Sequence, residues 1–558
     1  MGNNSTKSNS SGKDNSFLVQ AGILAAAGII SRIIGLLYRS PLQRVIGDLG
    51  LGYYQTAYNF YTIILLISSY SIPAAISKVI AQKLALKEYR NAHRIFLCAL
   101  GYVLVVGGAA SLFLFFGAGL FVEPEVIPVL RTFAPTIFVY GILGVLRGYF
   151  QAHKSMAQTS VSQVLEQIAN AAVSVGAAYL LIRSSFEAME IPADREGMVL
   201  WGSRGAVGSA MGTGAGVLAA LLFMLGMYAL NRGLIQRRIQ RDRHENADSY
   251  GSILRTITLV VTPFILSTAV YNLSSTVNNA LYTRVLPALK ELDTVEIHTR
   301  WGVFSRALII SNIPIAFASA MAAAMLPAVA QLIAAKNAAG ARDKIGLAVK
   351  TTMIISIPCA VGLFVLARPV TCLLFHNTQE SEDLATGLLM ALAVSVVFYA
   401  MSTLNSQILQ GLGKLKAPII NAGIALVIQT VVAGLLLFYT NLDLYSIAVV
   451  NIVYSGAMCI LNQISVRKAV GYRQEIMRTF LIPVLASAFM GAIAWGVYEL
   501  LLLLTKSPRI SVIPAIMIGA VVYFALLILF RGVTEKEMKG FPKGYLLVRI
   551  AKKCRLLK

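Results

Sequence analysis

The sequence "ISRIIGLLYRSPLQRVIGD", from Ile30 to Asp48, follows a mainly apolar run, 17–30, that is typical of the start of a membrane-spanning helix. Arg32 interrupts the apolar stretch, and Arg39 and Arg44 come after it. A cation at the centre of a spanning helix costs about 2.5–3.5 kcal/mol. Arg32 therefore needs a compensating interaction, and the rest of the chain indicates which kind.

The composition is that of a membrane protein. Of the 558 residues, 57% are hydrophobic and 13% are charged, which is more apolar surface than one soluble core can bury. The net charge of +23 could indicate nucleic-acid binding, but the basic residues lie in short loops between apolar runs rather than on one folded face. No CxxC or Cys/His spacing suits a metal or a disulfide. We therefore expect no nucleic-acid partner, metal or cofactor.

Fourteen apolar segments are each long enough to cross a bilayer, at about 20 residues per crossing. Lipid offers no partner to a bare backbone N–H group, and the alternating pattern of barrel strands does not occur in the sequence, so we predict an all-α integral membrane protein. The segments are 17–38, 56–80, 95–122, 128–150, 160–183, 206–230, 253–283, 301–334, 346–367, 384–410, 416–440, 444–466, 477–502 and 511–531.

The loops between these segments differ in charge on the two sides of the membrane. If the N-terminus is cytoplasmic, the loops on that side carry most of the Lys and Arg, and the opposite loops carry most of the Asp and Glu. This distribution is the positive-inside asymmetry, so we expect both termini to be cytoplasmic. No small-residue cleavage site follows the first apolar run, and we expect that span to be retained.

The two halves of the chain are similar in sequence. The stretch "SIPAAISKVIAQK" (71–83) recurs as "MLPAVAQLIAAK" (325–336), and 149–167 has a fainter counterpart in 408–429. The spacing of about 250–260 residues equals six spans, which predicts two parallel six-helix bundles around a central cavity, as in transporters. The predicted parts are a disordered cytoplasmic N-terminus (1–16), an N-terminal bundle (17–230), a cytoplasmic linker (231–252), a C-terminal bundle (253–466), an extra helix pair (477–531) and a basic cytoplasmic tail (532–558).

When the cations of the cytoplasmic loops and span ends are set aside, Arg147 among them, seven cations remain in the predicted spans. Five of them are near span ends, where a long side chain can reach the membrane surface: Lys78, Arg131, Arg183, Arg255 and Lys350. Arg32 and Arg306 lie deeper, and no Asp or Glu shares either span. Arg39 follows Arg32 by seven residues, on the same helix face about 10.5 Å away. Because a guanidinium fork matches phosphate oxygens, we predict that these three arginines line a substrate cavity.

Polar residues in the second span are candidate supports for this cavity. Gln55, Tyr58 and Asn59, in the stretch "GYYQTAYNFY", could face a sugar or a headgroup. Alternatively, the stretch belongs to the aromatic belt at the membrane surface, which is the interpretation we favour for Tyr53 and Tyr54.

Two further charged residues are candidate supports. Arg44 is near the outer end of the first span. Glu166, in "SQVLEQIANA", is the one acid well inside a predicted span. Intramembrane carboxylates often serve ion coupling, but Glu166 could equally pair with a cation or serve packing.

The motifs "ISRIIG" (30–35), "SIPAAISKVIAQK" and "RGYFQAHKSMAQTSVSQVLEQ" (147–167) resemble the stage V sporulation protein B branch of the polysaccharide-transporter group. That group belongs to the multidrug/oligosaccharidyl-lipid/polysaccharide exporter superfamily, which includes MurJ-like lipid II flippases. The resemblance covers most of the chain, including the fourteen spans and the repeat.

The resemblance implies a flippase, not an enzyme, that carries an undecaprenyl-pyrophosphate-linked cell-wall precursor across the cytoplasmic membrane of a bacterial cell by alternating access. Arg32 and Arg306 match family arginines of the first and eighth spans, and Arg39 matches a second first-span arginine. The sequence departs from better-known flippases at 64–71, "ILLISSYS", where they carry an arginine. The implied partners are the polyprenyl-linked sugar, membrane lipids, and a coupling ion or the membrane potential.

Three other functions stay open. A cation-coupled multidrug exporter of the same superfamily would need an acidic cavity, whereas the inner charges here are mainly basic. An intramembrane glycosyltransferase or ligase acting on polyprenyl-linked glycans would need a carboxylate or metal site, and the acidic loops 184–205 and 284–300 contain no DxD motif. A scaffold that recruits wall enzymes would not need intramembrane arginines.

Overall fold

The computed structural model describes residues 26–70, 72–153, 155–187, 189–240, 242, 248–334, 337–375, 378–535, 545, 549 and 552. The predicted polar N-terminus, the beginning of the first predicted span and most of the predicted basic tail lie outside the described residues. Within these ranges every regular element is a helix, which agrees with the fold class predicted from the sequence.

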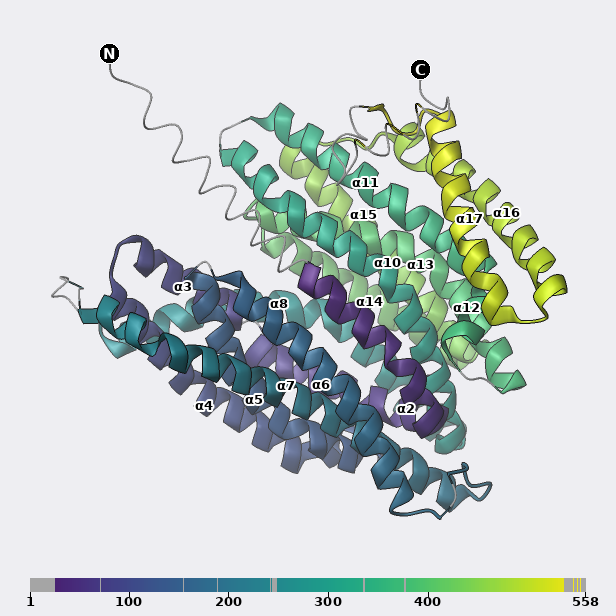
Figure 1. Ribbon diagram of the computed structural model, residues 1–558, viewed down its shortest axis with the longest axis horizontal. Coiled ribbons are helices and arrows are strands. Elements are labelled where there is room, and N and C mark those ends of the chain that lie inside the picture. The colour runs from purple at the N-terminus through teal and green to yellow at the C-terminus, as the bar shows by residue number, and fades with distance from the viewer. Residues whose placement is uncertain are drawn as a thin grey trace. The chain divides into compact units, whose positions relative to one another are not determined.

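The helices form two compact units, of which the first ends at Gly302 and the second begins at Val303. The division falls inside α10 (Thr294–Ala334), whose first turns belong to the first unit. A helix at Ala26–Leu37 leads into α2. The other elements of the first unit (Figure 1) are α2 (Arg39–Leu65), η1 (Leu66–Tyr70), α3 (Ile72–Ala85), α4 (Tyr89–Phe121), α5 (Ile127–Ala152), α6 (Met156–Arg183), α7 (Arg195–Gln240), α8 (Tyr250–Ala280), η2 (Leu281–Val285) and α9 (Leu286–Lys290).

The second unit contains the rest of α10 and the helices that follow it. In this unit α13 packs against α11 and α15, while α16 and α17 pack against each other and lie side by side in Figure 1. The elements are α11 (Ala338–Val365), α12 (Ala367–Leu374), α13 (Gln379–Gly411), α14 (Lys416–Tyr439), α15 (Leu444–Val470), η3 (Met477–Leu481), α16 (Ile482–Thr505) and α17 (Pro508–Leu529).

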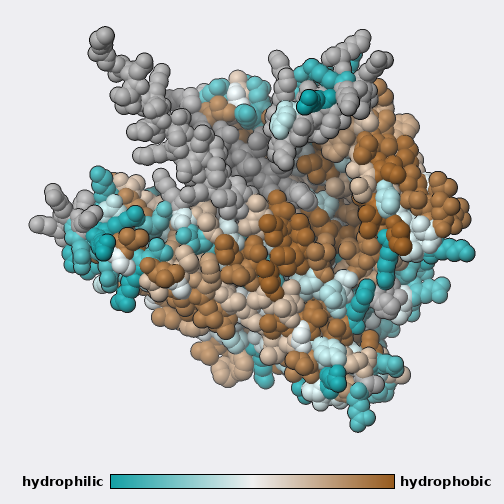
Figure 2. Space-filling model, viewed as in Figure 1, coloured by the Kyte–Doolittle hydropathy of each residue, from teal (hydrophilic) through white to brown (hydrophobic). Residues whose placement is uncertain are grey.

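Eleven helices in the described part of the chain are long and apolar enough to cross a membrane. The count takes Arg39–Ala85 as one stretch, and Ala26–Leu37 is a shorter apolar helix outside it. Large apolar side chains such as Leu104 and Phe116 are exposed, and Figure 2 shows apolar residues over much of the visible face. A surface of this kind suits lipid tails rather than water. The number fourteen stays a prediction.

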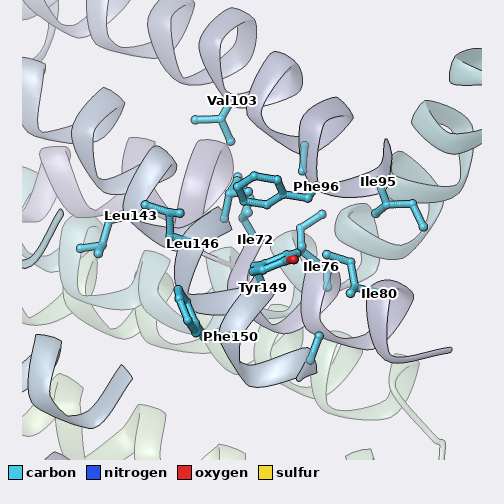
Figure 3. Packing of buried hydrophobic residues seen from close by; sticks show 14 of the residues in the cluster. Ile72, Ile76, Ile80, Ile95, Phe96, Val103, Leu143, Leu146, Tyr149 and Phe150 are labelled. Carbon is cyan, nitrogen blue, oxygen red and sulfur yellow. The ribbon is translucent and has the colours of Figure 1, made fainter. Parts of the chain in front are cut away.

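The stretch "SIPAAISKVIAQK" forms α3 and packs into the core of the first unit. Ile72, Ile76 and Ile80 are buried against α4 and α5, where Phe96 and Tyr149 lie 4.6 Å apart between ring centroids (Figure 3). The apolar residues of α3 recur every four positions, which places them on one helix face. Two motifs that carry the family resemblance therefore contact each other.

In the part of the chain that the structure describes, three π-helical turns interrupt the helices, and each one precedes a proline. The turn η1 is followed by Pro73, η2 by Pro287 and η3 by Pro483. Proline has no backbone N–H and its ring collides with the carbonyl one turn earlier. A locally wider turn accommodates that carbonyl, which explains the position of each π turn.

Gly47 divides α2 into two straight parts. Its φ of 70° lies in the left-handed region that glycine adopts without a steric penalty. The break frees carbonyl groups of the preceding turn, and the indole N–H of Trp201 in α7 donates to the carbonyl of Val45 at 3.1 Å. Gln43 also donates to Asp48 across the break at 3.0 Å. The stretch between the first two predicted spans, 39–55, is thus helical except for the break at Gly47, rather than a loop.

The helix ends differ from the predicted span limits. The helix α7 begins at Arg195 and continues to Gln240, well beyond the predicted span 206–230 and into the predicted linker 231–252. Its ends are polar, so hydropathy alone misses them. The helix α8 packs against α2, α3 and α4 in the first unit. The predicted assignment of six spans to each half of the repeat stays a prediction.

Candidate functional site

Arg32 of the first predicted span, and Arg39 and Arg44 just after it, lie on one nearly continuous helix. Arg32 belongs to Ala26–Leu37 and Arg39 begins α2, and backbone hydrogen bonds of 3.1 and 3.0 Å around Tyr38 connect the two segments. The side chains of Arg32 and Arg44 are exposed, whereas that of Arg39 is partly buried. Of these three candidates, Arg39 is therefore the one that packs against neighbouring helices.

Arg39 contacts an aromatic cluster in the first unit. Its guanidinium carbon is 6.0 Å from the centre of the Tyr54 ring. The Tyr54 ring stacks on Tyr58 at 5.7 Å and contacts Phe133 at 5.5 Å, and its hydroxyl lies 3.3 Å from that of Thr213. An aromatic face attracts a cation without neutralising it. The positive charge of Arg39 is therefore positioned, but not cancelled, by this cluster.

The predicted aromatic belt is wrong for Tyr53 and Tyr54. Both rings are 2% exposed and belong to the core of the first unit. Belt residues lie at the lipid surface, whereas Tyr54 faces α5 and α7 and Tyr53 packs edge-on against His298 at 5.0 Å. The α2 face that carries these tyrosines packs on other helices, which the sequence periodicity of one helix cannot reveal.

Gln55 and Asn59 form a polar pair one turn apart on α2. The Gln55 amide donates to the Asn59 side chain at 3.1 Å. The next residue, Thr56, accepts a hydrogen bond from Asn279 of α8 at 3.1 Å, and Thr276 donates to the backbone carbonyl of Asn59 at 3.4 Å. These contacts connect α2 with α8 through buried amide and hydroxyl groups. The contacts with α8 thus use the side chain of Thr56 and the backbone of Asn59, whereas the Gln55–Asn59 side-chain bond lies within α2.

Glu166 forms an ion pair in the structure. Its carboxylate accepts a hydrogen bond from the Arg147 guanidinium at 2.7 Å, and Arg147 also donates to Ser162 at 2.9 Å. Arg147 is 5% exposed. The sequence placed Arg147 among the loop cations and so missed this buried contact between α5 and α6. The signal was Glu166 itself, because an intramembrane acid requires a cation or a proton nearby.

Arg306 is almost completely buried in the second unit, at 1% exposure. Its guanidinium carbon lies 5.6 Å from the centre of the Phe375 ring, which follows the last residue of α12. The large side chain and its charge are thus packed on an aromatic face, as for Arg39 in the first unit.

The helices α2 and α10 approach most closely at two glycines. A Cβ on Gly52 would overlap the carbonyl of His298, and a Cβ on Gly302 would overlap the carbonyl of Asp48. Only the absence of a side chain permits backbones to pack this closely. The first turns of α10 are therefore fixed against α2 at the end of the first unit, four residues before Arg306.

His298 and Glu123 lie together beside this crossing. The imidazole Nε2 of His298 is 3.4 Å from the Glu123 carboxylate. His298 precedes the predicted span 301–334, and Glu123 follows the predicted span 95–122. Burial lowers the pKa of His298 to about 4, and burial raises the pKa of Glu123. Both shifts disfavour the charged forms, so His298 is neutral at physiological pH.

The structure thus groups the predicted residues as follows. Arg39 and Tyr58 share the aromatic cluster, Gln55 and Asn59 are paired on the adjacent turn, and Arg306 belongs to the second unit. Of the remaining candidates, Arg32 and Arg44 have exposed side chains and Glu166 forms an ion pair.

This architecture defines a class, a multi-pass and all-helical membrane protein with a transporter fold. The model of the family described as polysaccharide biosynthesis protein matches residues 17–333, and the chain belongs to this family. A second family model, MatE, matches residues 302–435. Both matches are consistent with the multidrug/oligosaccharidyl-lipid/polysaccharide exporter superfamily that the sequence motifs indicated.

Relatives of similar length extend this result. The lipid II flippase MurJ of Bacillus subtilis is 25% identical over 492 residues, which cover 84% of this chain and 86% of the relative. The stage V sporulation protein B of the same organism is 22% identical and covers 96% and 99% of the two chains. A solved structure of lipid II flippase MurJ, in an inward closed conformation, matches with a TM-score of 0.63, 16% identity and coverage of 91% and 98%. The flippase names describe transport rather than catalysis.

Proposed function

We propose that this protein is a flippase that moves an undecaprenyl-pyrophosphate-linked cell-wall precursor, lipid II or a related lipid-linked oligosaccharide, across the cytoplasmic membrane by alternating access. The observation that carries the proposal is the extent of the match to a relative named as a lipid II flippase, which includes 84% of this chain and 86% of the relative. A match of this length concerns the whole transport fold rather than one shared segment.

The arginines supply the chemistry that such a substrate needs. Arg39 and Arg306 each carry a positive charge held on an aromatic face, and a guanidinium group binds phosphate oxygens through two parallel hydrogen bonds. In this proposal they attract the diphosphate while the polyprenyl tail stays in lipid. Arg32 extends the same positive surface along the first helix.

Transport follows from differential binding. If the diphosphate binds a closed conformation of the cavity more tightly than the open one, its arrival shifts the equilibrium towards the closed conformation, from which the opposite side can open. The close crossing of α2 and α10 at Gly52 and Gly302 is a contact that such a change would alter. In this proposal, a coupling ion or the membrane potential supplies the energy for transport, and both termini of the chain are cytoplasmic.

The test uses cells that depend on this protein for growth. Depletion is expected to cause one lipid-linked precursor to accumulate, identified by mass spectrometry of the lipid extract, and to reduce its exposure at the outer leaflet. Re-expression of the wild-type chain should restore exposure. Unchanged precursor levels and unchanged exposure after depletion would contradict the proposal.

A multidrug exporter is the second candidate, because the MatE model matches residues 302–435. An exporter of cationic drugs would bind its substrate at acidic groups, whereas the candidate substrate-binding residues Arg39 of α2 and Arg306 of α10 are cations. Efflux of a cationic dye from cells that overproduce the protein distinguishes the two candidates. Dye efflux without any effect on precursor exposure would favour the exporter.

A further inference from the structure

A cavity of about 450 Å³ lies in the second unit, where the beginning of α11 meets the segment that joins α15 to α16. Three cations line it: Arg342 and Lys350 from α11, and Arg473 from the joining segment. The residues that line the cavity include neither Arg306 nor Phe375, and all of them belong to the second unit. The cavity is therefore separate from the residues assigned above to transport.

The cavity has a charged mouth and a buried polar floor. Arg342 and Arg473 are exposed. Lys350, Tyr472 and Thr479 are 5%, 6% and 2% exposed, respectively. Arg342 and Lys350 are separated by eight residues, so they lie on one face of α11 about 12 Å apart along the helix axis. A ligand that enters between the two exposed arginines would meet the lysine at the bottom.

Two glycines lie beside this space. Gly471, with a φ of 69°, ends α15 and turns the chain back towards α11. The Arg342 guanidinium lies 3.6 Å from where a Cβ on Gly471 would be. A Cβ on Gly346 would lie 3.4 Å from the Tyr472 ring, so the ring rests directly on this turn of α11. The backbone conformation thus places the cations around one hollow.

The polar lining indicates the kind of ligand. Two carboxylates, Asp343 and Glu475, also line the cavity, and Glu475 lies 3.7 Å from Arg478. The cations suit phosphate, whereas the carboxylates can accept hydrogen bonds from hydroxyl groups. Burial raises the pKa of Tyr472 to about 12, so its hydroxyl, like that of Thr479, keeps a proton to donate.

We propose that this cavity binds a small phosphate ester that carries hydroxyl groups, with Arg342, Lys350 and Arg473 holding the phosphate. The volume is within the range of small-ligand pockets, about 300–1,000 Å³. The same chemistry occurs in the headgroup of phosphatidylglycerol and in soluble glycerol 3-phosphate. The loops of this region are rich in Lys and Arg, and the predicted orientation places them at the cytoplasmic membrane surface, where both sources are present. The proposal does not depend on the transported substrate.

The test measures binding to the full-length protein in a neutral detergent. Calorimetric titrations use glycerol 3-phosphate, mixed micelles with phosphatidylglycerol, and mixed micelles with phosphatidylcholine as the neutral comparison. The pocket variant is R342Q/R473Q, which changes exposed residues and leaves the floor intact. The control variant R467Q/K468Q removes the same charge from the exposed last turn of α15. Lys350→Met, which keeps the apolar part of the side chain, tests the floor.

Wild-type protein and the control variant should bind with similar affinity, and the pocket variant should bind at least about tenfold more weakly, because it loses two charge-assisted hydrogen bonds. Lys350→Met should weaken binding to a similar extent. A loss seen with glycerol 3-phosphate identifies a soluble ligand, and a loss confined to phosphatidylglycerol identifies a lipid; either supports the site. No binding of either ligand to the wild type, or equal affinity of the pocket and control variants, would overturn the proposal.

Discussion

Arg147 in the first unit and Arg306 in the second are both buried cations of helices that the sequence assigns to the membrane, but their neighbours differ. Arg147 donates to the carboxylate of Glu166 at 2.7 Å and to Ser162 at 2.9 Å. Arg306 lies over the ring of Phe375, with the guanidinium carbon 5.6 Å from its centre. A carboxylate cancels the charge of an arginine, whereas an aromatic face attracts the cation and leaves its charge in place.

The difference separates structure from function. The Arg147 pair joins α5 to α6 and is complete within the protein, so we assign it to folding. Under the proposed function, the charge of Arg306 attracts the diphosphate of the substrate, so we propose a role in transport for this residue. Arg39, which also lies on an aromatic ring, belongs with Arg306 in this comparison. Four predictions test the distinction.

The largest expected effect is on stability. Arg147→Ala should lower the free energy of unfolding by about 3–5 kcal/mol, because it leaves the Glu166 carboxylate buried without its partner. Melting temperature in detergent measures this change. The double variant R147M/E166Q removes both charges and should recover most of the loss. A single variant as stable as the wild type would remove the structural assignment of this pair.

Arg306→Ala should have the next largest effect, on transport rather than on stability. Removing one partner of a desolvated charge pair costs about 2–5 kcal/mol, so precursor exposure at the outer leaflet should fall about 30-fold or more at equal protein level. Arg306→Lys should retain part of the activity, because it keeps the charge but not the fork. Arg467→Ala, at an exposed position of the same unit, serves as the control. Full exposure with Arg306→Ala would refute the comparison.

Gly302→Ala tests α10, the helix in which the first unit ends and the second begins. The added methyl would meet the carbonyl of Asp48, and overpacking of this kind typically costs about 1–3 kcal/mol. We expect a lower melting temperature together with reduced precursor exposure. Gly226→Ala is the matched control, since a Cβ there meets nothing within 4 Å. If the two variants have the same melting temperature and the same precursor exposure, the close packing of α2 on α10 at this crossing is not required.

The smallest expected effect concerns the aromatic support of Arg39. Tyr54→Leu removes the ring and should weaken transport by several-fold, because a cation–π contact contributes about 0.5–2 kcal/mol. Arg39→Ala should be more severe than Tyr54→Leu, and the exposed Arg44→Ala less severe than either. The order of these three variants in the exposure assay is the result to check. If Arg44→Ala reduced precursor exposure more than Arg39→Ala, the charge that transport requires would lie elsewhere on the helix.

Much of the fold could be predicted because a bilayer restricts the choices. Long apolar runs in lipid must be helices, and the structure contains helices at the predicted spans that it describes. The limits were less accurate, since hydropathy reports the apolar part of a helix and α7 continues beyond it to Gln240. The junction at Gly47 was missed for a related reason: one residue with a left-handed backbone replaces a loop without changing the composition.

The candidate site was less accessible from the sequence. Arg39 and Arg306 were found because charge in an apolar span is conspicuous in one dimension. Arg147 was counted as a loop cation, because its partner Glu166 is 19 residues away and their contact requires α5 and α6 to be packed. Tyr54 was assigned to a lipid-facing belt for the same reason, because a single helix does not show which of its faces is covered.

The central claim is that Arg306, which lies over the ring of Phe375, binds the substrate headgroup, whereas the Arg147–Glu166 ion pair serves folding. The most direct test is the equilibrium binding of undecaprenyl pyrophosphate to purified wild-type, Arg306→Ala and R147M/E166Q proteins in nanodiscs. We predict that Arg306→Ala binds about 30-fold or more weakly and that R147M/E166Q binds as tightly as the wild type. Equal affinity of the wild-type and Arg306→Ala proteins would contradict the claim.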